Sequence, residues 1–280
     1  MRRGRRLLGL VASLGLAVPA ASAAAAASPE PAVYLALGDS VAAGVGAVPS
    51  EENGYVAVLH ETLVAGRHCG QGSGVGCRLD LINLAQPGAT TTTLISGQLP
   101  AAVDLLAARR ATSTPVDDVR LVTLDVGGND LFTPVITACA TDPQSAGCVS
   151  TIVAQLSLVA ANYERILSAL RAAAGADTTI AVMTYYNPLG ACRLAALAPL
   201  AQLVLEGGGP VPAGLNDIIR ASAEAHGAVV AETAALVGPE DLVGGTDCLH
   251  PDNSGHADIA AAFAAVVDVD RVAGPPGRRR

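Results

Sequence analysis

Five short runs rich in Val, Ile and Leu recur along this 280-residue chain, and longer segments of helical character separate them. None of the runs alternates polar with apolar residues, so each is predicted to be a strand buried on both faces. The runs are 32–37, 80–85, 119–125, 179–184 and 228–231, and the helical segments are 54–65, 99–109, 150–174, 216–226 and 254–267. This alternation predicts an α/β fold with three layers, α/β/α, around a five-stranded parallel sheet.

The composition is that of a folded protein. Apolar residues make up 51% of the chain, which excludes intrinsic disorder, and the absence of a Gly-X-Y period or a sustained heptad excludes collagen and coiled coil. No internal repeat or low-complexity linker divides the chain after its N-terminal segment. We therefore expect residues 24–280 to form a single domain.

The N-terminus has the three parts of a secretory signal peptide. Four of the first six residues are Arg, an apolar run covers 7–18, and the small residues 21–23 (Ala-Ser-Ala) form a cleavage site. An uncleaved membrane anchor is the alternative, but this run is shorter than the roughly 20 residues that a bilayer requires, and Pro19 interrupts it. We expect residues 1–23 to be removed, the mature chain to lack a membrane-spanning segment, and the protein to be secreted to the extracellular space.

The net charge of the mature chain limits the classes of partner that it can bind. Cleavage leaves 13 basic residues against 25 acidic ones, a net charge of −12. So negative a protein is repelled by nucleic acids and by anionic membrane surfaces, and we expect neither as a ligand.

Six cysteines in an exported chain predict disulfide bonds. Six thiols allow 15 connectivities, but two of the possible pairs are close in sequence and enclose turn-rich stretches. The third pair then follows by elimination, which gives Cys69–Cys77, Cys139–Cys148 and Cys192–Cys248. A zinc site is disfavoured because the chain has no Cys-x-x-Cys and no Cys/His set with ligand spacing.

Four polar stretches carry candidate chemistry, and three of them directly follow predicted strands. In an open parallel sheet, such positions converge on the crevice outside the carboxyl ends of the strands. Taken singly, each stretch has a plain alternative as a helix cap or a turn. The stretches are 37–40 (Leu-Gly-Asp-Ser), 83–90 (Asn-Leu-Ala-Gln-Pro-Gly-Ala-Thr), 126–130 (Val-Gly-Gly-Asn-Asp) and 247–252 (Asp-Cys-Leu-His-Pro-Asp).

Together these stretches contain the groups of an activated nucleophile. Asp247 and His250 are three residues apart and can face each other across one turn, so that the carboxylate orients the imidazole. A neutral, oriented imidazole is what the hydroxyl of Ser40 needs in order to attack near neutral pH. Gly88 could offer its backbone N–H to an anion, and Asn129 could point its amide into the crevice.

The joint order of the four stretches resembles the SGNH (GDSL) hydrolase family over nearly the whole mature chain, about residues 33–263. The resemblance implies a flavodoxin-like sheet and a secreted serine ester hydrolase that needs no metal or organic cofactor. The cysteine spacing also looks like that of secreted actinobacterial lipases. One departure is Val41, where the pattern that names the family has Leu.

Carried over residue by residue, the resemblance implies a catalytic triad and an oxyanion hole. Ser40 would be the nucleophile, His250 the base and Asp247 the residue that orients the base. The N–H of Ser40 would join Gly88 and Asn129 as donors to the oxyanion.

The other histidines and Asp39 are expected to have roles outside the triad and the oxyanion hole. His256 could compete as the base, but it lacks an Asp three residues earlier and ranks behind. His60, His68 and His226 are expected on solvated surfaces. Asp39 could brace the nucleophile turn, and no partner cluster supports it as a metal ligand.

Residues 194–205 are apolar and rich in Ala, and Gly-Gly-Gly-Pro follows at 207–210. One interpretation is a hydrophobic wall or flap for an acyl chain, hinged by the glycines and tethered through a bond to Cys248. The other is a plain surface helix packed on the sheet, and the sequence slightly favours it.

We therefore expect a lipase or esterase acting on a small-molecule or lipid ester as a monomer, with deacetylation of carbohydrate esters as the alternative. A non-catalytic binding protein is disfavoured because Ser40, Asn129, Asp247 and His250 are all present. An α/β-hydrolase of the Gly-x-Ser-x-Gly type is disfavoured because that pentapeptide is absent. An acyltransferase would share every catalytic residue and stays open.

Overall fold

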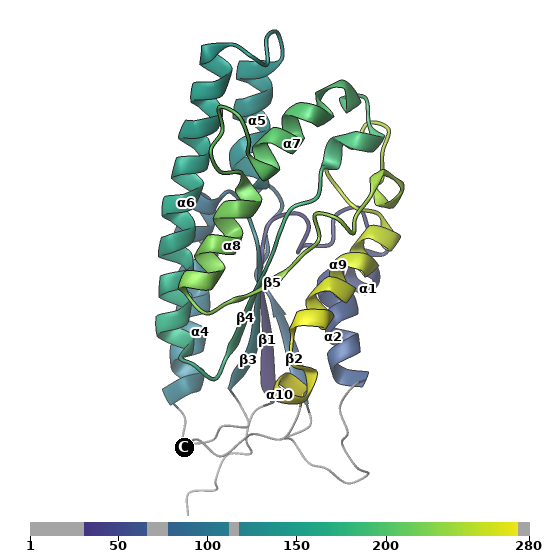
Figure 1. Cartoon of the computed structure of the whole chain (residues 1–280). Coiled ribbons are helices and arrows are strands. Elements are labelled where there is room, and N and C mark those ends of the chain that lie inside the picture. The colour runs from purple at the N-terminus through teal and green to yellow at the C-terminus, as the bar shows by residue number, and fades with distance from the viewer. Residues whose placement is uncertain (1–30, 66–77, 112–117, 274–280) are drawn as a thin grey trace, which may run out of the picture.

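A parallel sheet divides the molecule into two helical layers (Figure 1). The computed structural model describes residues 31–65, 78–111 and 118–273. Within these ranges five strands pair in the order β2-β1-β3-β4-β5, every pair parallel. They are β1 (Ala32–Gly38), β2 (Leu79–Asn83), β3 (Val119–Asp125), β4 (Thr179–Met183) and β5 (Val229–Ala231). The predicted α/β class and five-stranded parallel sheet are confirmed.

Burial within the sheet follows strand position. Every residue of β1 is buried, and β3 is buried except at one position, because each has a strand on both sides and a helix layer on both faces. The edge strands β2 and β5 are partly exposed, so the expectation that all five strands are buried on both faces was wrong for these two. An edge strand lacks one neighbour, which leaves that side open to water.

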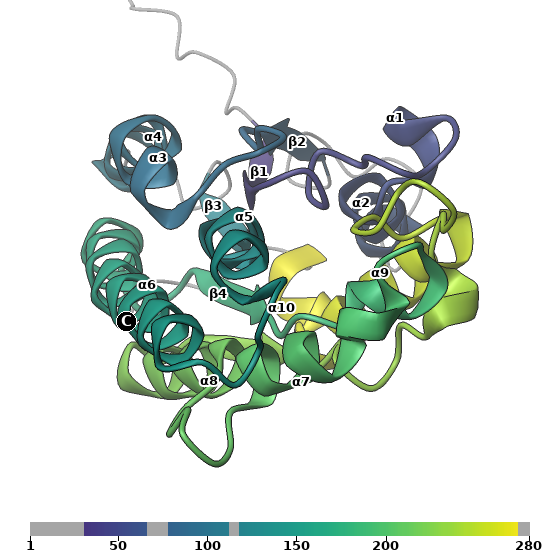
Figure 2. The same cartoon turned by 90° about the horizontal axis from the view of Figure 1, so that it is seen from above.

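Helices cover both faces of the sheet, as Figures 1 and 2 show from two directions. On one face lie α4 (Gln98–Ala111), α6 (Ala146–Ala174) and α8 (Leu215–Ala225), and on the other α2 (Tyr55–Ala65) and α9 (Asn253–Val266). The shorter elements are α1 (Ser50–Asn53), α3 (Thr91–Ser96), α10 (Val269–Ala273) and the 3-10 helices Pro188–Ala191, Ala195–Leu197 and Pro239–Asp241.

Beyond the carboxyl ends of the strands, α5 (Gly128–Cys139) and α7 (Ala198–Glu206) form a raised rim with the upper part of α6 (Figure 1). The disulfide Cys139–Cys148 joins the end of α5 to the start of α6, as expected. In the described part of the chain, α6 alone has the length and apolar composition of a membrane span. It is instead a packing helix here, since one stripe of its side chains, including Ile152, Val159 and Ile166, is fully buried.

One helix of this rim, α5, was not expected from the sequence. Its first residues read as a Gly-Gly-Asn-Asp turn, and Pro134 lies inside it. Local sequence therefore disfavours a helix here. Packing against α6 overrides this, since Leu131 and Val135 are buried in the core.

Two expectations concern segments outside the described residues. The signal peptide at 1–23 precedes residue 31, and the pair Cys69–Cys77 falls in the range 66–77.

Candidate active site

The turn that carries Ser40 leaves the sheet directly after β1. Gly38 ends the strand opposite Asp125 of β3, and a Cβ at position 38 would lie 2.5 Å from an oxygen of that carboxyl group. Only glycine permits this approach. Ser40 follows two residues later and is 8% exposed, so its hydroxyl is largely shielded from water.

The structure brings Ser40, His250 and Asp247 together, although 210 residues separate the first two. Ser40 Oγ lies 2.9 Å from His250 Nε2, and His250 Nδ1 lies 2.8 Å from Asp247 Oδ2. Because an ionised carboxylate can only accept, Nδ1 carries the proton and Nε2 is left to accept from the hydroxyl. The three side chains thus form one continuous line of hydrogen bonds.

Asp247 is held in its ionised state. Burial raises the pKa of its carboxyl group, but hydrogen bonds from the backbone N–H groups of Leu249 and His250 and from the His250 ring outweigh burial. The net effect is a pKa below the usual range, so the carboxylate is charged at neutral pH. A charged, fixed acceptor keeps the imidazole in one tautomer and one orientation.

The loop that presents His250 is fastened at several points. The disulfide Cys192–Cys248 ties it to the segment after β4, as expected. The Tyr186 hydroxyl donates to the Leu249 carbonyl at 2.9 Å. The N–H of Val243 donates to the His250 carbonyl at 3.1 Å. These contacts place the ring before any substrate arrives.

The three expected oxyanion donors differ in their surroundings. Asn129 lines the same pocket as Ser40, and its side-chain amide donates one bond to the Ala89 carbonyl at 3.0 Å, which leaves its second hydrogen available. Gly88, beside Ala89, is in a turn with φ +80° and is exposed. No hydrogen bond within the described residues uses the N–H of Gly88 or of Ser40.

An apolar pocket opens beside Ser40 and His250. Its empty volume is about 810 Å³, including the part that is open to solvent. Phe132 of α5 and Leu200 and Val204 of α7 are among the residues that line it. Most of its lining is hydrocarbon, and Ser40, Asn129 and His250 are among its few polar residues.

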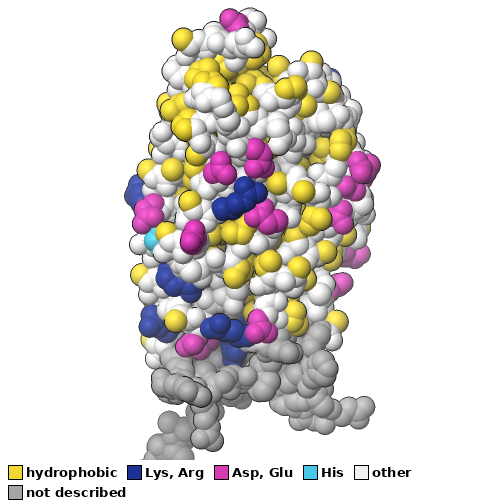
Figure 3. Space-filling model, viewed as in Figure 1, with side chains coloured by type: hydrophobic (Ala, Val, Ile, Leu, Met, Phe, Trp, Pro, Cys, Tyr) yellow, Lys and Arg dark blue, Asp and Glu magenta, His cyan; other side chains and the backbone are white. Residues whose placement is uncertain are grey.

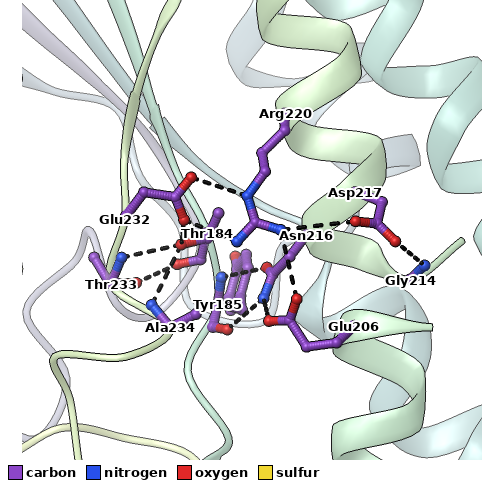
Figure 4. A network of polar contacts seen from close by, with 10 residues as sticks. All are labelled: Thr184, Tyr185, Glu206, Gly214, Asn216, Asp217, Arg220, Glu232, Thr233 and Ala234. Carbon is purple, nitrogen blue, oxygen red and sulfur yellow. Dashed lines mark hydrogen bonds and ion pairs between the residues drawn. The ribbon is translucent and has the colours of Figure 1, made fainter. Parts of the chain in front are cut away.

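Polar contacts hold the C-terminal end of α7 against α8 and the sheet (Figure 4). Asn216 Nδ2 donates to Glu206 Oε1 at 2.6 Å, and the Asn216 amide also bonds the backbone N–H and carbonyl of Tyr185. Arg220 binds both oxygens of Glu232, at 2.9 and 2.8 Å, and reaches Glu206 at 3.4 Å. The pocket wall is therefore tied to the same framework as the site.

These contacts decide between the two interpretations of residues 194–205. The segment forms a 3-10 turn and α7, which packs against α8 and also lines the pocket. A wall beside the site therefore describes it better than a plain surface helix. That the wall moves as a flap stays a prediction.

His256 does not compete for the role of base. Its ring is fully buried, Nδ1 accepts from the N–H of Tyr55 at 3.2 Å, and Nε2 donates to the carbonyl of Val45 at 3.0 Å. With both nitrogens bonded to backbone, the ring fastens the loop after Ser40 to α2 and α9.

Two other histidines differ from expectation. His60 and His226 were predicted to be solvated, but both are half-buried and hydrogen-bonded, to the carbonyl of Leu79 at 2.8 Å and to Glu164 at 2.9 Å. His60 lies where α2 meets the start of β2, and His226, which follows α8, lies against α6. Neither contact is visible in the local sequence, because each joins segments that are apart in the chain. His68 lies outside the described residues.

Comparison with known proteins identifies the family of the chain. Residues 36–257 match the model of the GDSL-like lipase/acylhydrolase family. No curated protein sequence matches the chain significantly.

Similar solved structures share the fold at low sequence identity. An extracellular lipase from Streptomyces rimosus is 19% identical with a TM-score of 0.56, covering 84% of this chain and 100% of that one. Phospholipase A1 from Streptomyces albidoflavus is 21% identical with a TM-score of 0.54, covering 85% and 100%. The acetylxylan esterase Axe2 from Geobacillus stearothermophilus is 16% identical with a TM-score of 0.52, covering 90% and 99%.

The burial of His256 predicts that acid destabilises the fold. Burial lowers the pKa of the ring in the folded protein, whereas the pKa of an unfolded histidine is about 6.5. Below that pH the unfolded chain takes up a proton that the folded chain does not, so the free energy of unfolding falls as the pH is lowered. Urea denaturation between about pH 7 and 5 should show this slope in the wild type and a smaller slope in His256→Gln. Equal slopes would assign the acid sensitivity to another group.

Proposed function

Because the chain belongs to the GDSL-like lipase/acylhydrolase family and is therefore a carboxylic ester hydrolase, we propose that Ser40 is its nucleophile and that its substrate carries an aliphatic acyl chain. One observation carries this proposal: Ser40 Oγ, 2.9 Å from His250 Nε2, lines an apolar pocket.

The proposed reaction proceeds through an acyl-enzyme. His250 Nε2 takes the proton of the Ser40 hydroxyl while Oγ forms a bond to the ester carbonyl carbon. Asp247 stabilises the imidazolium that results. His250 then gives the proton to the leaving alkoxide oxygen as the ester C–O bond breaks. Water attacks the acyl-enzyme by the same route and releases the acid.

Three donors are proposed for the tetrahedral oxyanion: the N–H groups of Ser40 and Gly88 and the side-chain amide of Asn129. Their support is that both backbone groups have no other partner within the described residues, and that Asn129 lines the pocket. Donors fixed before the reaction stabilise the developing charge without reorganisation, and one of them is typically worth about 2.7–4 kcal/mol of barrier.

The lining of the pocket favours an acyl chain longer than acetyl. Each buried methylene contributes about 0.8 kcal/mol, so the six that separate octanoyl from acetyl are worth about 5 kcal/mol if all are buried. A carbohydrate acetyl ester would leave this hydrocarbon wall unused. Figure 3 also shows hydrophobic side chains at the top of this face, around α7 and the upper end of α6, where charged side chains are sparse.

We also propose that the protein acts outside the cell as a monomer, after removal of residues 1–23. The support is the tripartite N-terminal sequence together with two disulfides, which form in oxidising compartments. The lipase from Streptomyces rimosus, which shares the fold, is described as extracellular.

A series of p-nitrophenyl esters from C2 to C16 tests the reaction and the substrate together. The wild type should hydrolyse them with an optimum above C2, because longer chains bury more surface in the pocket. Ser40→Ala should lose turnover while keeping its unfolding transition. Equal rates for the two proteins would remove Ser40 as the nucleophile, and an optimum at C2 would favour an acetyl esterase.

Filling the pocket should change the preferred acyl length. Ala201 of α7 lines the pocket, and Ala201→Phe should lower kcat/KM for octanoyl relative to acetyl esters by about tenfold, which corresponds to about two excluded methylenes. The matched control is Gln202→Phe, which adds an aromatic ring to the same helix at an exposed position outside the pocket. The same shift in both variants would contradict the assignment of the pocket.

Secretion can be tested by expressing the full chain in a secreting host. The protein should accumulate in the medium, and N-terminal sequencing should begin at residue 24. Retention in the membrane with Met1 intact would overturn this proposal and support the uncleaved anchor.

A further inference from the structure

Two carboxyl groups lie buried beneath the Ser40 turn, and the reaction above does not use them. Asp39 precedes Ser40 and is 2% exposed, and Asp125 ends β3 and is fully buried. Their side chains are hydrogen-bonded to each other. Neither was identified from the sequence as part of a pair.

The two carboxyl groups bind the backbone on both sides of Ser40. Asp125 Oδ2 accepts from the N–H of Ala42 at 3.2 Å and, more weakly, from that of Asp39 at 3.4 Å. Asp39 Oδ1 accepts from the N–H of Val41 at 2.9 Å. The amides before and after Ser40 are thereby held, and its own N–H is left for an oxyanion.

Two tyrosines complete the shell around the pair. Tyr55 of α2 donates its hydroxyl to Asp125 Oδ1 at 2.6 Å, and Tyr185, which follows β4, donates to Asp39 Oδ2 at 2.8 Å. All these hydrogen-bond donors are neutral. Five other titratable groups lie near the pair. They are Tyr34 of β1, Tyr163 of α6, Tyr186 after β4, His250 on its loop and His256 of α9.

Such a pair retains one proton at neutral pH. Burial raises the pKa of both carboxyl groups, and the charge of Asp39 raises the pKa of Asp125 further, well above its usual range. Two contacting carboxylates in a buried site cannot both ionise without a cation to offset them. The pair therefore holds one proton between its two carboxyl groups, and of the two pKa values that of Asp125 is raised further.

We propose that Asp125 is a positioning residue for Ser40, an inference that rests on the proposed role of Ser40 as nucleophile. The neutral carboxyl group of Asp125 shares one proton with Asp39 and fixes the backbone around Ser40, so that Oγ stays within reach of His250. Loss of that proton puts two like charges in contact, breaks the bond between the carboxyl groups and displaces the turn 39–42. Activity therefore falls at alkaline pH because Asp125 ionises.

Steady-state kinetics across pH test this role with three variants. Asp125→Leu keeps the branched shape of the side chain but removes every acceptor, and Asp125→Asn keeps an acceptor and a donor but cannot ionise. The control is Thr178→Val, which removes a buried hydroxyl that bonds the Val119 carbonyl at the opposite end of the sheet. The readouts are kcat, KM and the pH at which activity falls on the alkaline side.

Asp125→Leu should lower kcat by about a hundredfold, the cost of displacing a nucleophile by about 1 Å. Its KM should stay within about threefold of wild type, because Asp125 does not line the pocket. Asp125→Asn should recover most of the lost kcat and lack the alkaline fall. Thr178→Val should be less stable yet keep the wild-type kcat and pH profile.

A second measurement does not depend on catalysis. Between about pH 7 and 8 the folded wild type retains a proton that the unfolded chain has released, so its free energy of unfolding declines as the pH rises. In Asp125→Asn the free energy of unfolding should decline less steeply with pH, by the slope that one proton contributes. If Asp125→Leu does not fold, the proposal is still tested by the pH dependence of unfolding and by the alkaline activity profile of Asp125→Asn.

Any of three results would overturn the proposal. Activity could still fall at alkaline pH in Asp125→Asn, or Asp125→Leu could keep the wild-type kcat. The free energy of unfolding could also change with pH equally in the wild type and in Asp125→Asn. A wild type that hydrolyses no ester would overturn the proposed function, and with it the catalytic role of Asp125. The pH dependence of unfolding would still report the shared proton. Failure of the proposed function and failure of the proposal for Asp125 can therefore be told apart.

Discussion

The parallel pairing of β1 with β3 is the contact on which the rest of the site depends. Its register sets Gly38 against Asp125, so the turn with Ser40 and the start of α5 leave the sheet side by side. The strands approach this closely only because position 38 has no side chain. Asn129, in the first turn of α5, then reaches the same pocket as Ser40.

The second half of the site comes from the other end of the chain and is held independently. His250 lies on an irregular loop, which by itself would sample many conformations. The disulfide Cys192–Cys248, the hydroxyl of Tyr186 and the charged carboxylate of Asp247 remove that freedom. The imidazole is thus oriented in the free protein, which is the preorganisation that the proposed attack by the Ser40 hydroxyl requires.

Polar and apolar groups are sharply separated around Ser40. Beneath it lie the buried carboxyl groups of Asp39 and Asp125, with Tyr55 and Tyr185 as donors. Beside it lies the hydrocarbon wall built by α5 and α7. All five tyrosines of the chain are buried, and the hydroxyls of two of them bond these carboxyl groups. The low dielectric of these surroundings strengthens each hydrogen bond of the site.

The sequence by itself determined the α/β class, the five strands to within two residues, and the motifs containing Ser40, Asn129 and His250, because apolar runs and turn residues are local properties. Asp247 could be paired with its histidine for the same reason. Only the tertiary structure decided that α5 is a helix despite Pro134, that its side chains and those of α7 share one pocket, and that Asp125 meets Asp39. Those contacts depend on strand register and helix packing between segments far apart in the chain, and no local pattern encodes them.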